Sequence, residues 1–212
     1  MSLGSPLAVE GLWKRFRVRP HNDTGKFSAR SGDPLERWAL RGVSFDIPAG
    51  GALGVIGANG SGKSTLLSLV AGVLQPTQGR IRKRGRTVAI LNPTAGFHPD
   101  LSGRANIRML ATLHGFGRAD IESRMDAIIQ FSGLGDFIDQ PLRTFSAGMM
   151  IRLGFSTASH LDPDILVVDE VLSAGDLAFQ RQALGRARDL RQQGTALLVS
   201  THSLADLSTL CD

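Results

Sequence analysis

The chain has 212 residues, a formal net charge of +5 and 42% hydrophobic residues, a composition that is ordinary for a globular protein with a substantial core. No apolar run approaches the roughly 18 residues that a membrane-spanning helix needs, so the sequence excludes one. A single cysteine, Cys211, cannot form an intramolecular disulfide, which favours the cytosol as the compartment.

The first predicted element is a strand that begins near Pro6 and ends near Val18 in a basic stretch. Residues 20–36 are rich in Gly, Asp, Asn, Ser and Pro and predict a long exposed loop or a hairpin tip. The basic clusters at 14–19 and 80–86 could face nucleic acid or an anionic membrane surface. We interpret both clusters as solvated strand edges, where charges discourage edge-to-edge pairing.

A phosphate-binding motif follows two short predicted strands, 43–47 and 52–56. It is a complete G-x-x-x-x-G-K-[ST] sequence, Gly57-Ala58-Asn59-Gly60-Ser61-Gly62-Lys63-Ser64. A helical run over 65–71 comes next, which gives the strand–loop–helix context that the motif requires. Glycines let successive backbone N–H groups point at phosphate oxygens, and the helix N-terminus adds positive potential. Lys63 is expected to reach the β- and γ-phosphates, and Ser64 is expected to ligate Mg²⁺.

The pattern becomes helical between two predicted strands, 87–91 and 165–169. Three segments have helical spacing: 104–114, 119–131 and 147–160. We therefore predict a helical insertion over roughly 95–160 that interrupts an α/β nucleotide-binding core.

The strand over 165–169 ends in two acids, Asp169 and Glu170. Acids at the carboxyl end of such a strand face the crevice where ligands bind in α/β sheets. Asp169 is placed to hold Mg²⁺, directly or through water, and Glu170 is placed to polarise an attacking water. Downstream, Asp176 is predicted to cap a helix that runs to about Gln193.

Two further segments supply candidate phosphate contacts. Ser146 can cap the helix over 147–160, and the small residue Gly148 leaves backbone N–H groups unobstructed, which makes a second anion site. His202 follows a last predicted strand, 196–200, where an imidazole can donate to a phosphate oxygen or orient water.

Together, these segments resemble the nucleotide-binding subunit of ATP-binding-cassette (ABC) transporters over about residues 7 to 212. The order carries the resemblance: phosphate loop 57–64, signature 145–149, acid strand 165–170, D-loop 173–176 and switch His202. The resemblance implies an α/β fold, a P-loop NTPase core of the ABC-ATPase type with an antiparallel β subdomain and an inserted helical subdomain. It also implies a head-to-tail homodimer, with ATP between the phosphate loop of one subunit and Ser146 and Gly148 of the other. Because the chain stops ten residues after His202, we expect its C-terminal end to be truncated.

The resemblance also implies a full set of site residues. Catalysis is expected from Glu170, His202 and Lys63. Nucleotide contacts are expected from Phe16, Gly57, Asn59, Gly60, Ser61, Gly62, Lys63, Ser64, Thr65, Ser146 and Gly148, and Mg²⁺ contacts from Ser64, Asp169 and Asn92.

Two positions of the implied site stay open. The Q-loop glutamine of most ABC proteins is missing, and Asn92 or Pro93 stands in its place. Asn92 could still offer a carbonyl oxygen to Mg²⁺ or water, whereas Pro93 could not. The aromatic that stacks on the base aligns with Phe16, and Trp38 is the second candidate.

The subfamily is indicated by three unusual stretches: the signature Ser-Ala-Gly-Met at 146–149, residues 94–106 around Gly-Phe-His-Pro, and residues 161–180. They resemble the ATPase subunits of polysaccharide exporters, which move lipid-linked O-antigen, capsular polysaccharide or teichoic acid across the inner membrane. The resemblance implies a separate permease subunit as partner, docked on residues 92–104 through Phe97, His98, Pro99 and Leu101. It also implies a peripheral position on the cytoplasmic face of that membrane and no nucleic-acid partner. Three alternatives stay open: an exporter of lipids or drugs, a soluble ABC ATPase acting on DNA or ribosomes, and a non-catalytic ATP-binding scaffold.

Overall fold

The computed structural model describes residues 4–18, 35–92, 96–169 and 176–201, together with Ser208, Leu210 and Cys211. Within these residues, three strands form an antiparallel sheet in the order β2-β1-β4, and four form a parallel sheet in the order β3-β7-β6-β5. The strands are β1 (Leu7–Val18), β2 (Leu35–Ile47), β3 (Ala52–Val55), β4 (Gln78–Lys83), β5 (Thr87–Ile90), β6 (Ile165–Asp169) and β7 (Ala196–Ser200). The helices are α1 (Lys63–Ala71), α2 (Gly103–Leu113), α3 (Arg118–Ser132), α4 (Ala147–Ser159) and α5 (Leu177–Gln192), with short 3-10 turns η1 (Gly135–Asp139) and η2 (Leu142–Thr144).

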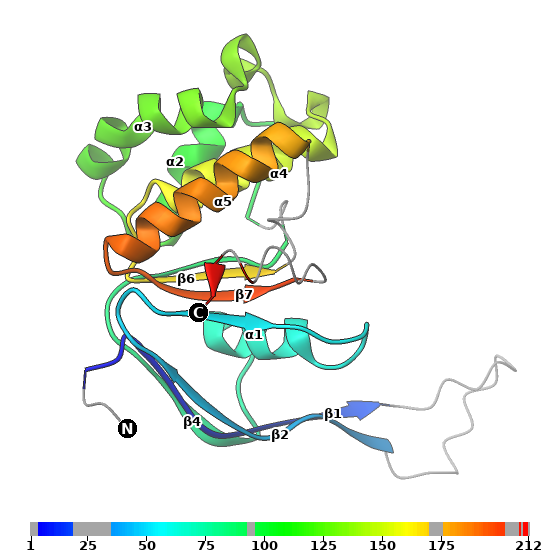
Figure 1. Ribbon diagram of the computed structural model, residues 1–212. Helices are drawn as coiled ribbons and strands as arrows, with labels where there is room; N and C mark the ends of the chain where they lie inside the picture. The colour runs from blue at the N-terminus through cyan, green and yellow to red at the C-terminus, as the bar shows by residue number, and fades with distance from the viewer. Residues whose placement is uncertain are drawn as a thin grey trace, which may run out of the picture.

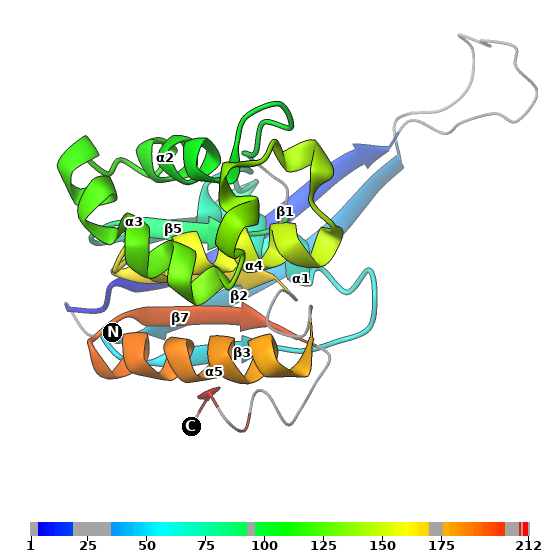
Figure 2. The same ribbon diagram turned by 90° about the horizontal axis from the view of Figure 1, so that it is seen from above.

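The molecule is layered around the parallel sheet. Figure 1 shows α1 between the two sheets and the helices α2 to α5 on the opposite face of the parallel sheet. Seen from above, α5 runs alongside β7 and β3, while α2 and α3 lie over β5 (Figure 2). Among the described residues, no helix is long and apolar enough to cross a membrane.

Both faces of the parallel sheet are buried, which explains why β6 and β7 are continuous apolar runs. Alternate residues of β6 enter different cores because side chains alternate across a strand. Leu166 and Val168 pack with the helices α2 to α5, and Ile165 and Val167 pack with α1 and the antiparallel sheet.

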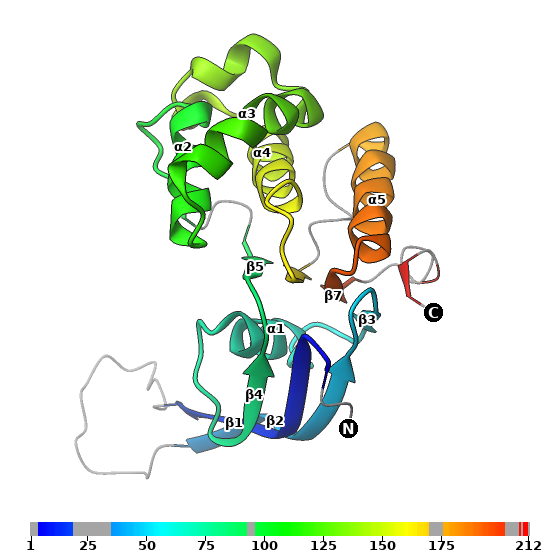
Figure 3. The same ribbon diagram turned by 90° about the vertical axis from the view of Figure 1, so that its left-hand side faces the viewer.

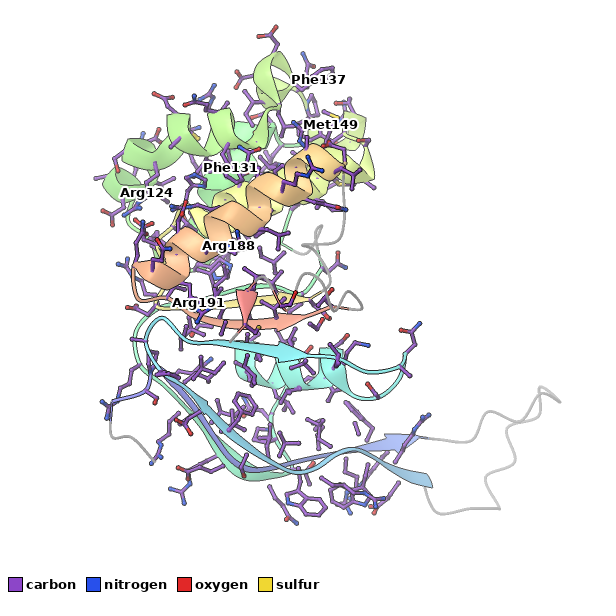
Figure 4. The ribbon with its side chains drawn as sticks, viewed as in Figure 1. Arg124, Phe131, Phe137, Met149, Arg188 and Arg191 are labelled. Carbon is purple, nitrogen blue, oxygen red and sulfur yellow. The ribbon has the colours of Figure 1, made fainter. Side chains whose placement is uncertain are left out.

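The helical insertion is confirmed between β5 and β6. On α3, Ile121, Met125 and Ile128 are buried at a spacing of four and three residues, as its apolar pattern predicts. Aromatic rings of three helices meet here. The Phe131 ring on α3, labelled in Figure 4, lies 5.9 Å from the Phe179 ring on α5, and the Phe155 ring on α4 lies near both. These ring contacts pack the helical insertion against α5, which belongs to the α/β nucleotide-binding core.

The antiparallel sheet differs from its prediction in the start of β2, and it agrees with the prediction in its charged edge strand. β2 begins at Leu35, eight residues before the predicted strand at 43–47, because register shifts along the β1–β2 pairing disturb the alternation that marks a strand. β4 was expected only as a charged edge, and it is the edge strand next to β1. Beyond Trp13, β1 pairs only with β2 among the described residues, so Lys14, Arg15 and Arg17 lie on a two-stranded extension. Most of the loop predicted over 20–36 lies outside the described residues.

Candidate nucleotide-binding site

The phosphate loop connects β3 to α1 in a conformation that needs glycine. Gly60 and Gly62 have φ angles of +78° and +102°, in the left-handed region that other residues avoid. A Cβ atom added to Gly62 would lie 2.6 Å from the carbonyl oxygen of Ala39 on β2. Only glycine therefore lets the loop approach the antiparallel sheet this closely.

The N-terminus of α1 is suited to an anion. Its cap residue is Gly62, which has no side chain to occupy the amides of the first turn, and that turn contains no acid. The N–H groups of a first helical turn and the helix dipole together favour a negative charge there. Ser64 lies exposed in this turn, with Thr65 half-buried behind it.

Lys63 lies folded over its own loop. Its side chain is only 7% exposed, and its ammonium donates to the carbonyl oxygens of Gly57 at 2.8 Å and Ala58 at 3.3 Å. The positive charge of Lys63 therefore lies beside exposed loop residues, where a phosphate chain would bind. These residues are Gly57, Asn59, Gly60 and Ser61.

Asp169 lies at the same edge of the parallel sheet as this loop. In register, Asp169 of β6 faces Ser200 of β7, which in turn faces Val55 of β3, just before the loop. Two strand spacings of about 4.8 Å therefore separate Asp169 from the start of the loop. The Ser200 hydroxyl donates to the Asp169 carboxylate and fixes its orientation.

Asn92 lies exposed two residues after β5, which neighbours β6 at this same edge. Three of the residues singled out by sequence, Pro93, Glu170 and His202, lie outside the described residues.

An exposed Ser64 hydroxyl and the Asp169 carboxylate are the kinds of ligand that Mg²⁺ takes together with substrate phosphates. The described residues contain no group of three or more His, Cys, Asp or Glu side chains placed to hold a metal by themselves. Ser64 and Asp169 therefore fit a Mg²⁺ ion that binds together with a phosphorylated ligand.

The second anion site is on the far side of the parallel sheet. Ser146 caps α4, and its hydroxyl accepts from the Met149 N–H at 3.2 Å, as predicted. In the described part of the chain, outside its own helix backbone and its two neighbours, the atom nearest to a Cβ added at Gly148 is the Ser146 Oγ at 3.8 Å. Figure 3 shows α4 in the helical layer and α1 below the parallel sheet, so one chain does not bring Ser146 and Lys63 together.

Phe16 and Trp38 lie on opposite faces of the antiparallel sheet. Trp38 pairs directly with Arg15, whose guanidinium lies over its ring at 5.4 Å, and its edge contacts Trp13. Because successive side chains of a strand alternate, Phe16 points to the other face. There the Lys14 ammonium lies 5.1 Å from the Phe16 ring and donates to the Gln75 carbonyl, just beyond α1. Phe16 therefore shares the face of α1 and the phosphate loop.

The segment predicted to dock a partner is only partly exposed. Phe97 packs against the helical core, whereas Leu101 is 38% exposed. The sequence predicted a contact made by Phe97, His98, Pro99 and Leu101; His98, Pro99 and Leu101 are exposed and Phe97 is half-buried, so the docking contact stays a prediction. Sequence reasoning missed Asn106 and Ser200, two fully buried polar residues that organise the site's surroundings.

Comparison with known proteins defines the class. The family description "ABC transporter" matches residues 40–173. The chain therefore belongs to the ABC transporter family and is an ATP-binding domain of that family. Its fold is similar to that of the ATP-binding subunit of an ABC transporter, with a TM-score of 0.80 and 24% identity over 98% of this chain and 84% of that one.

Curated relatives narrow the resemblance further. The chain is 49% identical over 174 residues to the O-antigen export system ATP-binding protein RfbB of Myxococcus xanthus, and 47% identical over the same length to that of Klebsiella pneumoniae. It is 39% identical over 211 residues to the teichoic acids export ATP-binding protein TagH of Lactococcus lactis. These alignments cover 82%, 82% and 97% of this chain, and 40%, 71% and 45% of the respective relatives.

Proposed function

We propose that this protein is the ATP-hydrolysing subunit of an exporter that moves lipid-linked polysaccharide across the inner membrane through a separate permease. The observation that carries the proposal is the identity of up to 49% with O-antigen export ATP-binding proteins. The phosphate loop, with Lys63 held beside it and Asp169 at the same sheet edge, supports the ATPase part. The chain works at the cytoplasmic face of the membrane, where ATP is available.

The chemistry is attack of water on the γ-phosphorus of ATP. Charge spreads over the phosphoryl oxygens in the transition state, so positioning and electrostatic stabilisation dominate catalysis. Bound Mg²⁺ would neutralise the negative charge of the phosphates. Ser64 and Asp169 would hold it, and Asn92 would be a further ligand; the exposure of Ser64 and Asn92 and the position of Asp169 at the sheet edge support this. Lys63 and the α1 N-terminus contact the phosphates, His202 contacts the γ-phosphate, and Glu170 orients the attacking water.

Completion of the site requires a second copy of the chain. Ser146 and Gly148 lie on the opposite side of the parallel sheet from the phosphate loop, yet both are suited to an anion. A head-to-tail dimer brings the Ser146 of one subunit to the phosphate loop of the other. Phe16 stacks on the base, because it lies on the face of the phosphate loop.

The test of hydrolysis is a Glu170→Gln variant. We expect nucleotide affinity within about twofold of wild type and turnover reduced by about 10²–10⁴-fold, the usual contribution of a group that orients and deprotonates water. Nucleotide binding and steady-state phosphate release are measured on the same preparation. Wild-type turnover in the variant would remove Glu170 from the mechanism, and lost binding would make it a structural carboxylate.

The test of export is complementation. The gene is expressed in a strain that lacks its own O-antigen export ATPase but retains the permease, and glycan on the cell surface is measured. Restored export that requires Lys63 supports the proposal. If the purified protein hydrolyses ATP but copurifies with ribosomes or DNA rather than with a permease, the alternative of a soluble ABC ATPase replaces it.

A further inference from the structure

Asn106 on α2 is a buried polar side chain that organises the loop over 98–102. The side chain has no exposed surface. Its Oδ1 accepts from the His98 N–H at 2.7 Å, and its Nδ2 lies within 3.1 Å of three carbonyl oxygens, those of His98, Leu101 and Ser102. One side chain therefore holds both ends of the loop.

The same loop is fastened to residues 140–143. Three backbone N–H groups donate hydrogen bonds between the two segments. The Leu142 N–H donates to the Leu101 oxygen at 3.0 Å, and the Arg143 N–H donates to the Pro99 oxygen at 2.9 Å. The Gly103 N–H donates to the Gln140 oxygen at 3.3 Å. The Arg143 guanidinium also contacts the Asp100 carboxylate at 2.6 Å, an exposed pair that contributes little by itself. The 98–102 loop and residues 140–143 are thus joined by a short ladder of backbone hydrogen bonds.

Residues 140–143 lead directly to the cap of α4. The Phe145 amide donates to the Leu142 oxygen at 2.9 Å, and its ring is buried. A Cβ atom on Gly103 would lie 2.8 Å from the Ile138 oxygen and 3.3 Å from the Phe145 ring, so the start of α2 packs against this turn without spare room. Only Thr144 and Phe145 separate the ladder from Ser146.

We propose that Asn106 is a positioning residue that sets the placement of Ser146, by making the 98–102 loop and the N-terminus of α4 one rigid body. The inference rests on the proposed function, in which Ser146 completes the nucleotide site of a second copy. Asn106 itself touches no nucleotide. A displacement of the exposed Leu101 is carried through the ladder to Ser146, while the phosphate loop of the same chain is left unchanged.

The test compares Asn106→Asp with a matched control, Ser132→Ala. The aspartate keeps an acceptor for the His98 N–H but removes the N–H donors and turns a carboxylate toward carbonyl oxygens. Ser132 is equally buried in the same helical layer, its hydroxyl bonds the Ile129 oxygen and the Leu134 amide, and those bonds lie outside the ladder. Both variants lose buried hydrogen bonds, so both lose stability.

In Asn106→Asp, we expect the ATP affinity of the monomer to stay within about twofold. ATP-driven dimer formation and turnover should fall about tenfold, because a displaced Ser146 loses about one hydrogen bond to the nucleotide of the partner subunit. In Ser132→Ala, dimer formation and turnover should stay near wild type. If wild type neither dimerises nor hydrolyses ATP, the proposed function fails. If wild type does both and the two variants behave alike, the inference about Asn106 fails.

Hydrogen exchange of the wild-type chain decides the inference even if Asn106→Asp does not fold. The amides of His98, Leu142 and Met149 each donate within the proposed rigid body. We expect them to open with one shared free energy in native-state exchange. A Met149 amide that opens independently of His98 and Leu142 would overturn the proposal.

Discussion

At the scale of single residues, the base-stacking position illustrates how geometry separates two candidates of the same type. Phe16 and Trp38 are both aromatic and lie near each other on paired strands, yet their faces differ because Trp38 pairs with Arg15. The Trp38 ring is already engaged by Trp13 and Arg15. Phe16 is 37% exposed on the face of the phosphate loop.

The corresponding prediction is a pair of alanine variants. Phe16→Ala should weaken ATP binding about tenfold, because stacking of a base on an aromatic ring is worth about 1–3 kcal/mol. Trp38→Ala should lower the melting temperature through the lost ring contacts and leave ATP affinity unchanged. Fluorescence titration with a nucleotide analogue and thermal unfolding measure the two effects. The opposite pattern would assign the stack to Trp38.

At the scale of elements, the C-terminal end of α4 is a junction of buried and charged groups. Arg186 of α5 donates to the Ser159 carbonyl at 2.8 Å, and Arg124 of α3 donates to the His160 carbonyl at 3.0 Å. Both guanidinium groups also contact the carboxylate of Asp162, which has a left-handed φ of +44°. The His160 ring packs on Phe131, and its Nδ1 lies 2.8 Å from the Ser156 oxygen.

This junction makes stability depend on pH. Burial lowers the pKa of His160, and the nearby Arg186 and Arg124 lower it further, against opposing effects of the Ser156 carbonyl and Asp162. His160 therefore binds a proton more readily in the unfolded chain than in the folded chain. The free energy of unfolding should therefore fall as pH drops from about 7 toward about 5. His160→Gln should flatten this dependence in thermal unfolding. An unchanged slope would show that His160 does not control it.

The elements that the sequence predicted correctly are those with strong local signals. The helix from Asp176 is confirmed because the carboxylate accepts the Phe179 amide at 2.9 Å, a contact that also lowers the pKa of Asp176. β6 and β7 are confirmed at the predicted bounds because both are apolar throughout. The first half of β2 was missed, since its stability comes from pairing with β1 rather than from its own pattern.

The candidate site was predictable to a similar degree. The phosphate motif carries its own geometry in glycine spacing, so the loop could be located from sequence. The hydrogen bond between Asp169 and Ser200 could not be predicted from sequence, because neither strand's own residues reveal which strands lie next to each other in the sheet. The roles of Glu170 and His202 stay predictions.

At the scale of the whole molecule, the separation of the two anion sites predicts ATP-dependent association. The Glu170→Gln variant should trap a dimer in Mg-ATP, because ATP binds without being turned over. Sizing with and without nucleotide measures it, and Lys63→Ala in the same background is the control that should stay monomeric. A chain that stays monomeric with ATP at high concentration would contradict the head-to-tail arrangement.

Coupling to a permease belongs to this scale too. Leu101 is the exposed apolar residue of the 98–102 loop, so Leu101→Asp should abolish export in complemented cells while ATPase activity of the isolated subunit stays near wild type. Phe97→Asp should likewise uncouple export while basal ATPase stays near normal, and lost ATPase activity or unfolding in that variant would show that the packing of Phe97 against the helical core is its main role. Normal export by a folded Leu101→Asp protein would place the contact elsewhere.

The C-terminal end of α4 is anchored by two arginines. Arg186 and Arg124 donate directly to carbonyl groups there, on the side where Figure 4 labels Arg124, whereas Met149 marks the opposite end. Toward that opposite end, Arg152 donates to the Ser132 and Gly133 carbonyls at 2.8 Å and 3.1 Å, so this half of α4 is bonded to the end of α3. At 1.5 Å per residue, the 13-residue helix is a lever arm of about 20 Å. A tilt of about 10° around the anchored end would sweep Ser146 through about 3 Å, the length of one hydrogen bond. A small rotation of the helical layer is therefore enough to make or break a phosphate contact.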